Sequence, residues 1–419
     1  MSRRGVLWIA FAIVHVLVAV LGFVLPNQPM GDVYNVYDPW SSWALEGRTV
    51  VGITETWVYP QLALVPMILA RVLAWIAGYE VSWAILIALC DALAFAMLVG
   101  RGRSNGRTAA AWFWLAFMLL LGPVGMYRLD GITVPLAVAG CLWLVGRPWL
   151  GSILLAAATW MKVWPAALLG AAVIAVKRRF TVLAGAALVS GLTLAAIFAA
   201  GGISHAFGFI GDQTDRGLQL EAPISAWYLW RAVLGIPGSY IYYDRDILTF
   251  EVMGPGKEVV AAVMTPLLIL AVGAVASVGA WKAWRGASFV RLFPALALAL
   301  VAALILFNKV GSPQYVTWII APLVVGLVID RHRWWRPAAL GLAIAVITQV
   351  IYPLTYGDLL DARALPAALL TLRNALVAVL LVWALVRVAQ VPGRTIAGRG
   401  TIAGRRTAVF GRSAGTIGS

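Results

Sequence analysis

The run VLWIAFAIVHVLVAVLGFVL at residues 6–25 decides the fold class of this chain. It holds about twenty nearly all apolar positions, with His15 as the one ionisable side chain, and a helix of that length crosses about 30 Å of hydrocarbon. Arg3 and Arg4 precede the run, and no convincing small-residue cleavage site follows Phe23. We therefore expect a retained first transmembrane helix rather than a signal peptide.

Similar apolar runs follow along the 419 residues, of which 62% are hydrophobic and only 12% are charged. A soluble fold of this composition would have too little polar surface to cover itself, so the bilayer is the expected solvent. We predict an all-α polytopic membrane protein with one integral domain at residues 1–388. Beyond the first helix, crossings are expected near residues 81–100, 108–122, 132–146, 149–163, 164–176, 180–200, 257–281, 288–307, 315–330, 337–353 and 366–388. The total is about twelve transmembrane helices.

Basic residues predict the orientation of this bundle. They gather in short loops at Arg3, Arg4, Arg101, Arg103, Arg107, Arg147, Lys177, Arg178, Arg179, Lys282, Arg285, Arg331, Arg333 and Arg336. The positive-inside rule places these loops and both termini in the cytoplasm. Residues 60–77 must then lie at the outer interface or re-enter from it, and Pro60, Pro66 and Arg71 within that run favour this interpretation. Two large loops, 26–60 and 201–256, become external.

The net charge of +15 does not indicate a nucleic-acid partner, because the basic residues lie in membrane-proximal loops and the tail, where lipid headgroups explain them. The tail, residues 389–419, is basic and Gly-rich, and we expect it to be disordered and cytoplasmic. The sequence has no phosphate-cradling Gly-rich loop, no dinucleotide fingerprint and no His/Cys metal spacing. We predict no cofactor and no metal site. A divalent metal stays an open alternative, for which the two carboxylates of Asp244 and Asp246 are only a weak signal.

Carboxylates and aromatic residues are concentrated after the first helix, in GDVYNVYDPW at residues 31–40. Asp32 and Asp38 are the two candidates for a catalytic base, which must lie within hydrogen-bond reach of the group that it deprotonates. The alternative is that both merely cap short helices, since Asp is a preferred N-cap residue. Lys162 lies among apolar residues with no neighbouring anion in the sequence, so we expect it to face a polar cavity in which an anionic ligand supplies the missing charge.

The order of motifs resembles a known enzyme family. Asp32 with Val36-Tyr37 is followed by Tyr59-Pro60, Asp130-Gly131, Lys162-Val163-Trp164-Pro165, Asn308-Lys309 and Pro313-Gln314-Tyr315. This order resembles the polyprenyl-phosphate-mannose-dependent α-mannosyltransferases of actinobacteria, in the GT-C glycosyltransferase superfamily, over residues 1 to about 385. The resemblance implies a GT-C-like helix bundle that transfers a sugar, mannose being the family's commonest one, from a polyprenyl-phosphate donor to a glycolipid or glycan acceptor at the outer face of the cell membrane.

The resemblance implies the role of the catalytic base, and the types of residue suggest ligands for the donor and the acceptor. Asp32 becomes the base, with Asp38 in reserve. The donor phosphate is expected to contact Lys162, Lys309 and Arg128. Acceptor and sugar contacts are expected from Tyr37, Trp40, Tyr59, Glu221, Gln314 and Tyr315.

Two other classes of function stay open. A transporter or flippase for a lipid-linked or small polar substrate also combines many crossings with broken helices and buried charge. Against it, the two halves show no internal repeat, and the polar residues concentrate on the external side. A non-catalytic membrane subunit is the other alternative. His15 and Asp91, both inside predicted crossings, are expected to pair with each other, or with Arg71 or Arg373, as packing contacts.

Overall fold

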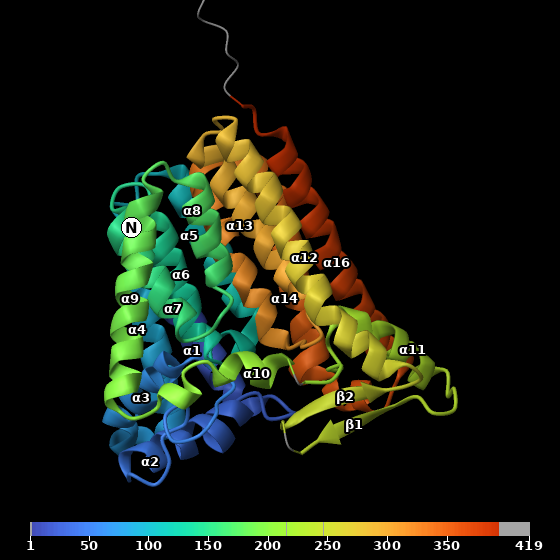
Figure 1. Ribbon diagram of the computed structural model, residues 1–419. Coiled ribbons are helices and arrows are strands. Elements are labelled where there is room, and N and C mark those ends of the chain that lie inside the picture. Colours follow the sequence, from blue (N-terminus) through green and yellow to red (C-terminus); the bar gives the residue numbers. More distant parts are fainter. Residues whose placement is uncertain (1, 215, 246, 394–419) are drawn as a thin grey trace, which may run out of the picture.

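Helices make up almost the whole fold in this computed structural model, which describes residues 2–214, 216–245 and 247–393 (Figure 1). The longer helices are α1 (Arg3–Val24), α3 (Leu64–Ala77), α4 (Tyr79–Val99), α5 (Asn105–Leu121), α6 (Asp130–Trp143), α7 (Pro148–Thr159), α8 (Ala166–Ala175), α9 (Arg179–Ala199), α12 (Lys257–Trp284), α13 (Phe289–Leu306), α14 (Ile320–Gln349) and α16 (Ala364–Gln390). The short ones are η1 (Val33–Tyr37), α2 (Asp38–Leu45), η2 (Gln61–Ala63), η3 (Gly122–Gly125), η4 (Ile203–His205), α10 (Gly208–Thr214), η5 (Pro223–Ser225), α11 (Ala226–Val233), η6 (Pro313–Ile319), η7 (Val350–Leu354) and α15 (Tyr356–Leu360).

The predicted all-α membrane class is confirmed by the length and apolar character of these helices. Among the described residues, eight segments are long and apolar enough to cross a membrane. They are Arg3–Val24, Tyr79–Val99, Asn105–Gly125, Arg179–Ala199, Lys257–Trp284, Phe289–Leu306, Pro313–Leu354 and Ala364–Gln390.

The predicted number of about twelve crossings is not confirmed, because three of the expected runs form short helices. Runs 132–146, 149–163 and 164–176 fold as α6, α7 and α8, with 14, 12 and 10 residues. At about 1.5 Å per residue these helices fall well short of about 30 Å. The chain therefore turns back within the bundle before α6, at Asp130, and between α7 and α8, at Lys162, and these two polar residues pair with each other.

Helix α14 is a helical hairpin folded at Asp330, whose backbone is not helical (φ −149°, ψ 78°). A Cβ atom added at Gly341 would lie 3.0 Å from Cδ1 of Leu323, although a straight helix would separate these residues by about 27 Å. The indole of Trp334 likewise packs directly on Gly326. The predicted crossings 315–330 and 337–353 are the two arms of this hairpin.

The predicted basic loops meet at one end of the bundle. Arg3 Nη1 donates a hydrogen bond to Asn105 Oδ1 (3.2 Å), and Lys282 Nζ donates one to the carbonyl oxygen of Val391 (3.1 Å). Figure 1 shows the N-terminus and the C-terminal end of α16 at this end, whereas α2, α3, α10 and the β hairpin lie at the other. Which side of the membrane the basic end faces stays a prediction, and the predicted tail lies outside the described residues from residue 394 onward.

At the other end, the two predicted large loops carry short elements of their own. Loop 201–256 holds α10, α11 and the antiparallel pair β1 (Tyr240–Asp244) and β2 (Thr249–Met253), in the register Tyr240↔Met253. The loop packs on the segment after α13, because Gln219 N donates to the carbonyl oxygen of Lys309 (3.1 Å). Run 60–77 forms η2 and α3, and α3 turns at Gly78 (φ 87°) to pack beside α4. Its interfacial position stays a prediction.

A buried pair joins α1 to α4. His15 Nε2 lies 3.0 Å from Asp91 Oδ2, and Nδ1 of the same ring lies 2.9 Å from the carbonyl oxygen of Phe11. The expectation that His15 and Asp91 make a packing contact is confirmed, with each as the partner of the other. Arg71 and Arg373 contact other carboxylates, namely Asp38 and Glu221.

Candidate functional site

Four separate segments bring polar side chains together at the end of the bundle opposite the basic loops. They are the chain after α1, the turn before α6, the connection between α7 and α8, and η6. The side chains that meet there, called the polar site below, are Asp32, Tyr59, Arg128, Asp130, Lys162 and Tyr315. Because α6, α7 and α8 are short, the polar site is recessed toward the centre of the bundle.

Lys162 is held by a protein carboxylate. Its Nζ lies 2.5 Å from Oδ2 of Asp130, whose side chain is completely buried. The other oxygen of Asp130 accepts a hydrogen bond from Trp318 Nε1 (2.6 Å). The expectation that Lys162 lacks an anion in the protein is therefore wrong, because sequence proximity did not reveal a partner 32 positions away.

Asp32 forms an ion pair with Arg128, with 3.3 Å between its Oδ2 and Nε of the arginine. The Arg128 side chain is 7% exposed and that of Asp32 is 35% exposed. Arg128 also donates to the carbonyl oxygens of Pro29 and Tyr127 (both 2.9 Å) and to the hydroxyl of Tyr352 (3.1 Å). The arginine is thus fixed by the protein, while about a third of the Asp32 side chain stays exposed.

Asp38 lies in a different environment. Its carboxylate pairs with Arg71, which also donates to the Asp38 backbone carbonyl and to Ser41 Oγ (2.8 Å). Partial burial raises the pKa of Asp38, and the charge of Arg71 opposes this rise. Neither its hydrogen bonds nor its ion pair connects Asp38 to the polar site. The structure therefore separates the two candidate bases and places Asp32 in the polar site.

Aromatic rings form one wall of the polar site. Trp40, Trp57 and Tyr59 contact one another edge to face, with centroid distances of 5.3 to 6.3 Å. Lys162 Nζ lies 5.8 Å from the ring centre of Tyr59. Burial raises the pKa of Tyr59, and the carboxylates of Asp32 and Asp130 raise it further. The buried Nε1 of Trp57 has no hydrogen-bond partner.

A second group of rings lies on η6. Tyr315 stacks on Trp318 at 4.1 Å, and Trp318 stacks on Trp164 at 5.7 Å. Lys162 Nζ is 5.5 Å from the centre of the Tyr315 ring, so the ammonium group lies between Tyr59 and Tyr315. Gln314, the other predicted contact from this segment, is buried and accepts a hydrogen bond from Ser312 Oγ.

Tyr37 supports the polar site from the interior. Its side chain is buried, its ring packs on Trp83 at 4.8 Å, and its hydroxyl accepts a hydrogen bond from the backbone N–H of Leu129 (3.1 Å). Tyr37 therefore fixes the turn that carries Arg128 and Asp130. Its predicted contact with sugar stays a prediction.

Glu221 and Lys309 lie beside the polar site, in the region where loop 201–256 packs on the segment after α13. Arg373 donates to a carboxylate oxygen of Glu221 (2.7 Å) and to its backbone carbonyl (2.9 Å). Burial raises the pKa of Glu221, and the charge of Arg373 opposes the rise. Lys309 is buried, and its backbone carbonyl accepts from Gln219 N. Their predicted contacts with sugar and phosphate stay predictions.

Two further residues of interest were not among the predicted site residues. Asp130 can be identified from the sequence, because it immediately precedes an apolar run and lies on the same predicted side of the membrane as Lys162. Arg216 lies in the middle of loop 201–256 and has no such signal. It is within electrostatic reach of Tyr59 and Tyr315, and its Nε is buried without a hydrogen-bond partner.

Within the part of the chain that the structure describes, no group of three or more His, Cys, Asp or Glu side chains is arranged to hold a metal ion. No protein-family model, no curated protein and no solved structure matches this chain. A functional assignment therefore depends on the chemistry of the polar site and on the order of the sequence motifs.

Proposed function

We propose that this chain is a membrane glycosyltransferase that moves a sugar, mannose by the resemblance of its motifs, from a polyprenyl-phosphate donor to a lipid- or glycan-linked acceptor at the outer face of the membrane. One observation carries the proposal. A partly exposed carboxylate, Asp32, shares a recessed site with the buried Lys162–Asp130 pair and two groups of aromatic rings, at one end of an apolar bundle.

The proposed chemistry is a single displacement. Asp32 accepts the proton of an acceptor hydroxyl, and the oxygen of that hydroxyl attacks the anomeric carbon of the donor sugar. The bond between this carbon and the phosphate oxygen breaks, and its electron pair leaves with the polyprenyl phosphate. The partial exposure of the Asp32 side chain supports this role, because a base must contact the acceptor.

The depth of the polar site along the helices suits a donor whose phosphate is attached to a lipid. Lys162 follows the 12 residues of α7, which begin at the basic end of the bundle, so it lies about 18 Å from that end. This depth falls within the hydrocarbon layer of about 30 Å. A phosphate that arrives laterally, with its polyprenyl chain between helices, reaches this depth more easily than a soluble nucleotide sugar.

The leaving phosphate requires cationic contacts. Lys162 and Arg128 already pair with Asp130 and Asp32. A donor phosphate would therefore bind next to existing ion pairs and not to cations that lack a counter-ion. Arg216 adds a guanidinium group whose Nε has no partner, and we include it among the donor-phosphate ligands together with Lys309. The rings of Trp40, Tyr59 and Tyr315 supply faces for the sugars.

The test compares Asp32→Asn with wild-type chain in vesicles supplied with radiolabelled polyprenyl-phosphate-mannose and endogenous glycolipid. Removal of a general base lowers transfer by about 100-fold or more. Glu46→Gln is the matched control, because Glu46 is an exposed carboxylate of the same loop paired with Arg48, and it should keep wild-type transfer. Unchanged transfer by Asp32→Asn, at equal expression and equal unfolding temperature, excludes it as the base.

Asp38→Asn decides between the two candidate bases. If Asp32 is the base, the Asp38→Asn variant transfers sugar at the wild-type rate per folded molecule. The opposite pattern, with transfer lost only in Asp38→Asn, would make Asp38 the base.

A transporter or flippase is the second candidate. It is favoured by the short helices α7 and α8, because the connection between them carries Lys162 of the buried ion pair. Proteoliposomes that contain a labelled polyprenyl-phosphate sugar distinguish the two. A transporter moves the label across the bilayer without breaking the sugar–phosphate bond, whereas the proposed enzyme releases polyprenyl phosphate.

A further inference from the structure

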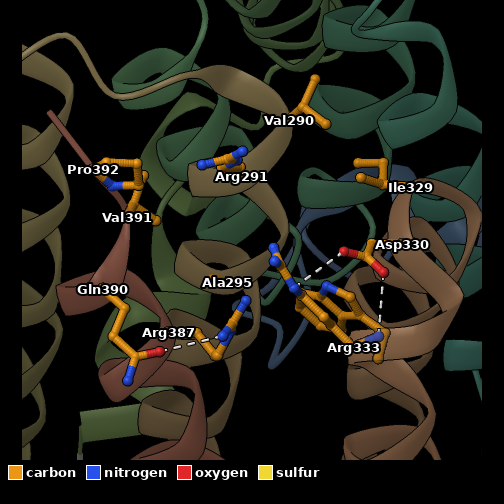
Figure 2. Close-up of a pocket in the computed structure, with 11 residues that line it drawn as sticks. Val290, Arg291, Ala295, Ile329, Asp330, Arg333, Arg387, Gln390, Val391 and Pro392 are labelled. Carbon is orange, nitrogen blue, oxygen red and sulfur yellow. Dashed lines mark hydrogen bonds and ion pairs between the residues drawn. The ribbon is translucent and has the colours of Figure 1, made fainter. Parts of the chain in front are cut away.

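The basic end of the bundle contains a cavity that takes no part in the proposed transfer. It has a volume of about 510 Å³ and lies between the start of α13, the bend of α14 at Asp330 and the end of α16. Figure 2 shows the side chains of Arg291, Arg333 and Arg387 around it, together with one acidic residue, Asp330. The cavity is distinct from the polar site, which lies at the opposite end.

A smaller hollow of about 260 Å³ adjoins this cavity and shares Arg333 and Arg387 with it. The hollow adds His332, Arg336 and the rings of Trp335 and Trp383. Among the residues that the structure describes, the two hollows present arginines at four positions and one carboxylate, that of Asp330. That carboxylate already contacts Arg333 at 3.5 Å, so the positive charge of the other arginines is not neutralised within the lining.

The chemistry of the lining is that of a phosphate site at a membrane interface. Guanidinium groups bind phosphate oxygens through paired hydrogen bonds, which lysine cannot reproduce. Trp335 is exposed, and Trp383 lies beneath Arg387, whose guanidinium is 5.8 Å from its ring centre. Indole rings and arginines at the ends of apolar helices mark the level of lipid headgroups.

The apolar part of the lining favours a lipid over a soluble phosphate. Val290 is 47% exposed, and Ile329 and Val391 also line the cavity. A soluble anion gains nothing from these side chains, whereas the glycerol and upper acyl carbons of a lipid cover them. Basic pockets between transmembrane helices are suited to anionic headgroups in this way.

We propose that this cavity binds the phosphate headgroup of an anionic phospholipid, with Arg291, Arg333 and Arg387 as its ligands. The lipid bridges the start of α13, the bend of α14 and the end of α16, and its acyl chains run along the exposed surfaces of these helices. The assignment is independent of the proposed transferase activity, because it shares no residue with the polar site.

The experiment is native mass spectrometry of the full chain in detergent with equal amounts of phosphatidylglycerol and phosphatidylcholine. We expect retained phosphatidylglycerol, and at least tenfold weaker retention in the double variant Arg291→Gln/Arg387→Gln. The control is Arg101→Gln/Arg178→Gln, which removes the same charge from exposed positions at the same end, outside the cavity. Asp330→Asn removes the one acidic residue of the lining and should strengthen retention.

Several outcomes would overturn the proposal. Equal retention of the two lipids would contradict a specific site. An equal loss of phosphatidylglycerol in the control variant would indicate only a general attraction between a basic surface and an anion. Displacement of phosphatidylglycerol by millimolar glycerol 3-phosphate would identify the ligand as a soluble phosphate ester. Since the arginines replaced are at the surface, the unfolding temperature in phosphatidylcholine should match that of wild type, and this confirms that each variant is folded.

Discussion

Replacement of Lys162 by methionine tests whether the buried ion pair holds the polar site together. Nζ lies 2.5 Å from Oδ2 of Asp130, and the Asp130 side chain is completely buried. At an effective dielectric constant of about 20, two unit charges at this separation attract by about 7 kcal/mol before the cost of desolvation is subtracted. Removal of one partner of a buried pair lowers the free energy of unfolding by about 3 to 5 kcal/mol, and we expect Lys162→Met to fall in this range.

The double variant Lys162→Met/Asp130→Asn should recover part of that loss, because it leaves no unpaired buried carboxylate and keeps an oxygen for the Trp318 N–H. The assay is denaturant unfolding in detergent micelles, with Lys177→Met as the control because Lys177 is exposed at the basic end. Two results would contradict a stabilising ion pair. One is a double variant whose loss in free energy of unfolding equals the sum of the losses in Lys162→Met and Asp130→Asn. The other is a loss in Lys162→Met that is no larger than the loss in Lys177→Met.

The same variants separate folding from phosphate binding. If Lys162 serves only to pair with Asp130, the double variant transfers sugar in proportion to the fraction that is folded. If Lys162 also contacts the donor phosphate, the double variant folds but transfers at a rate at least about tenfold lower.

Two further predictions concern the surroundings of the polar site. Because burial and nearby carboxylates raise the pKa of Tyr59 from its ordinary value of 10.0, its hydroxyl keeps its proton through the neutral range. Tyr59→Phe should therefore leave the shape of the pH dependence of transfer unchanged between about pH 6 and about pH 9, and a changed profile would show that Tyr59 titrates there. Gly311→Ala should lower the free energy of unfolding by about 1 to 3 kcal/mol and reduce transfer, because the new Cβ would lie 2.2 Å from the backbone nitrogen of Ala222. Gly273→Ala, whose Cβ would meet nothing within 4 Å, is the matched control, and an equal effect of the two substitutions would contradict a role for this close contact.

The helical bundle could be predicted from the sequence because long apolar runs have few alternatives in a bilayer. The predicted crossing 180–200 became α9 (Arg179–Ala199), and 288–307 became α13 (Phe289–Leu306). The shorter runs were harder, since hydropathy alone does not show where a chain turns back inside the bundle. Hydropathy therefore predicts full crossings for the runs that form α6, α7 and α8.

Side-chain partners were less predictable than helices. The pairing of His15 with Asp91 was one expected alternative, because a buried polar group in a membrane requires a partner and few are present. The pairing of Lys162 with Asp130 was not expected, because it depends on how α6 and the α7–α8 connection approach each other. The periodicity of apolar residues in the sequence does not indicate how these two segments pack against each other.

The carboxylates in and around the polar site differ in how firmly they are held. Asp130 has no exposed side-chain surface and is bound by both Lys162 and Trp318. Glu221 is also buried, and Arg373 donates to its carboxylate and to its backbone carbonyl. Asp32 makes one ion pair, at 3.3 Å, and is 35% exposed. A base must reach its acceptor, so among these three Asp32 is suited to proton transfer, while Asp130 and Glu221 position their neighbours.

One short turn connects Asp32, the proposed base, to the buried pair of Lys162 and Asp130. Arg128, the partner of Asp32, and Asp130, the partner of Lys162, are separated by Leu129, whose backbone N–H donates to the Tyr37 hydroxyl. A displacement of this turn therefore moves both counter-ions together. If a phosphate displaces Asp130 from Lys162, the turn carries Arg128 with it and changes the environment of Asp32. Binding of the donor and readiness of the base would then be linked through three consecutive residues.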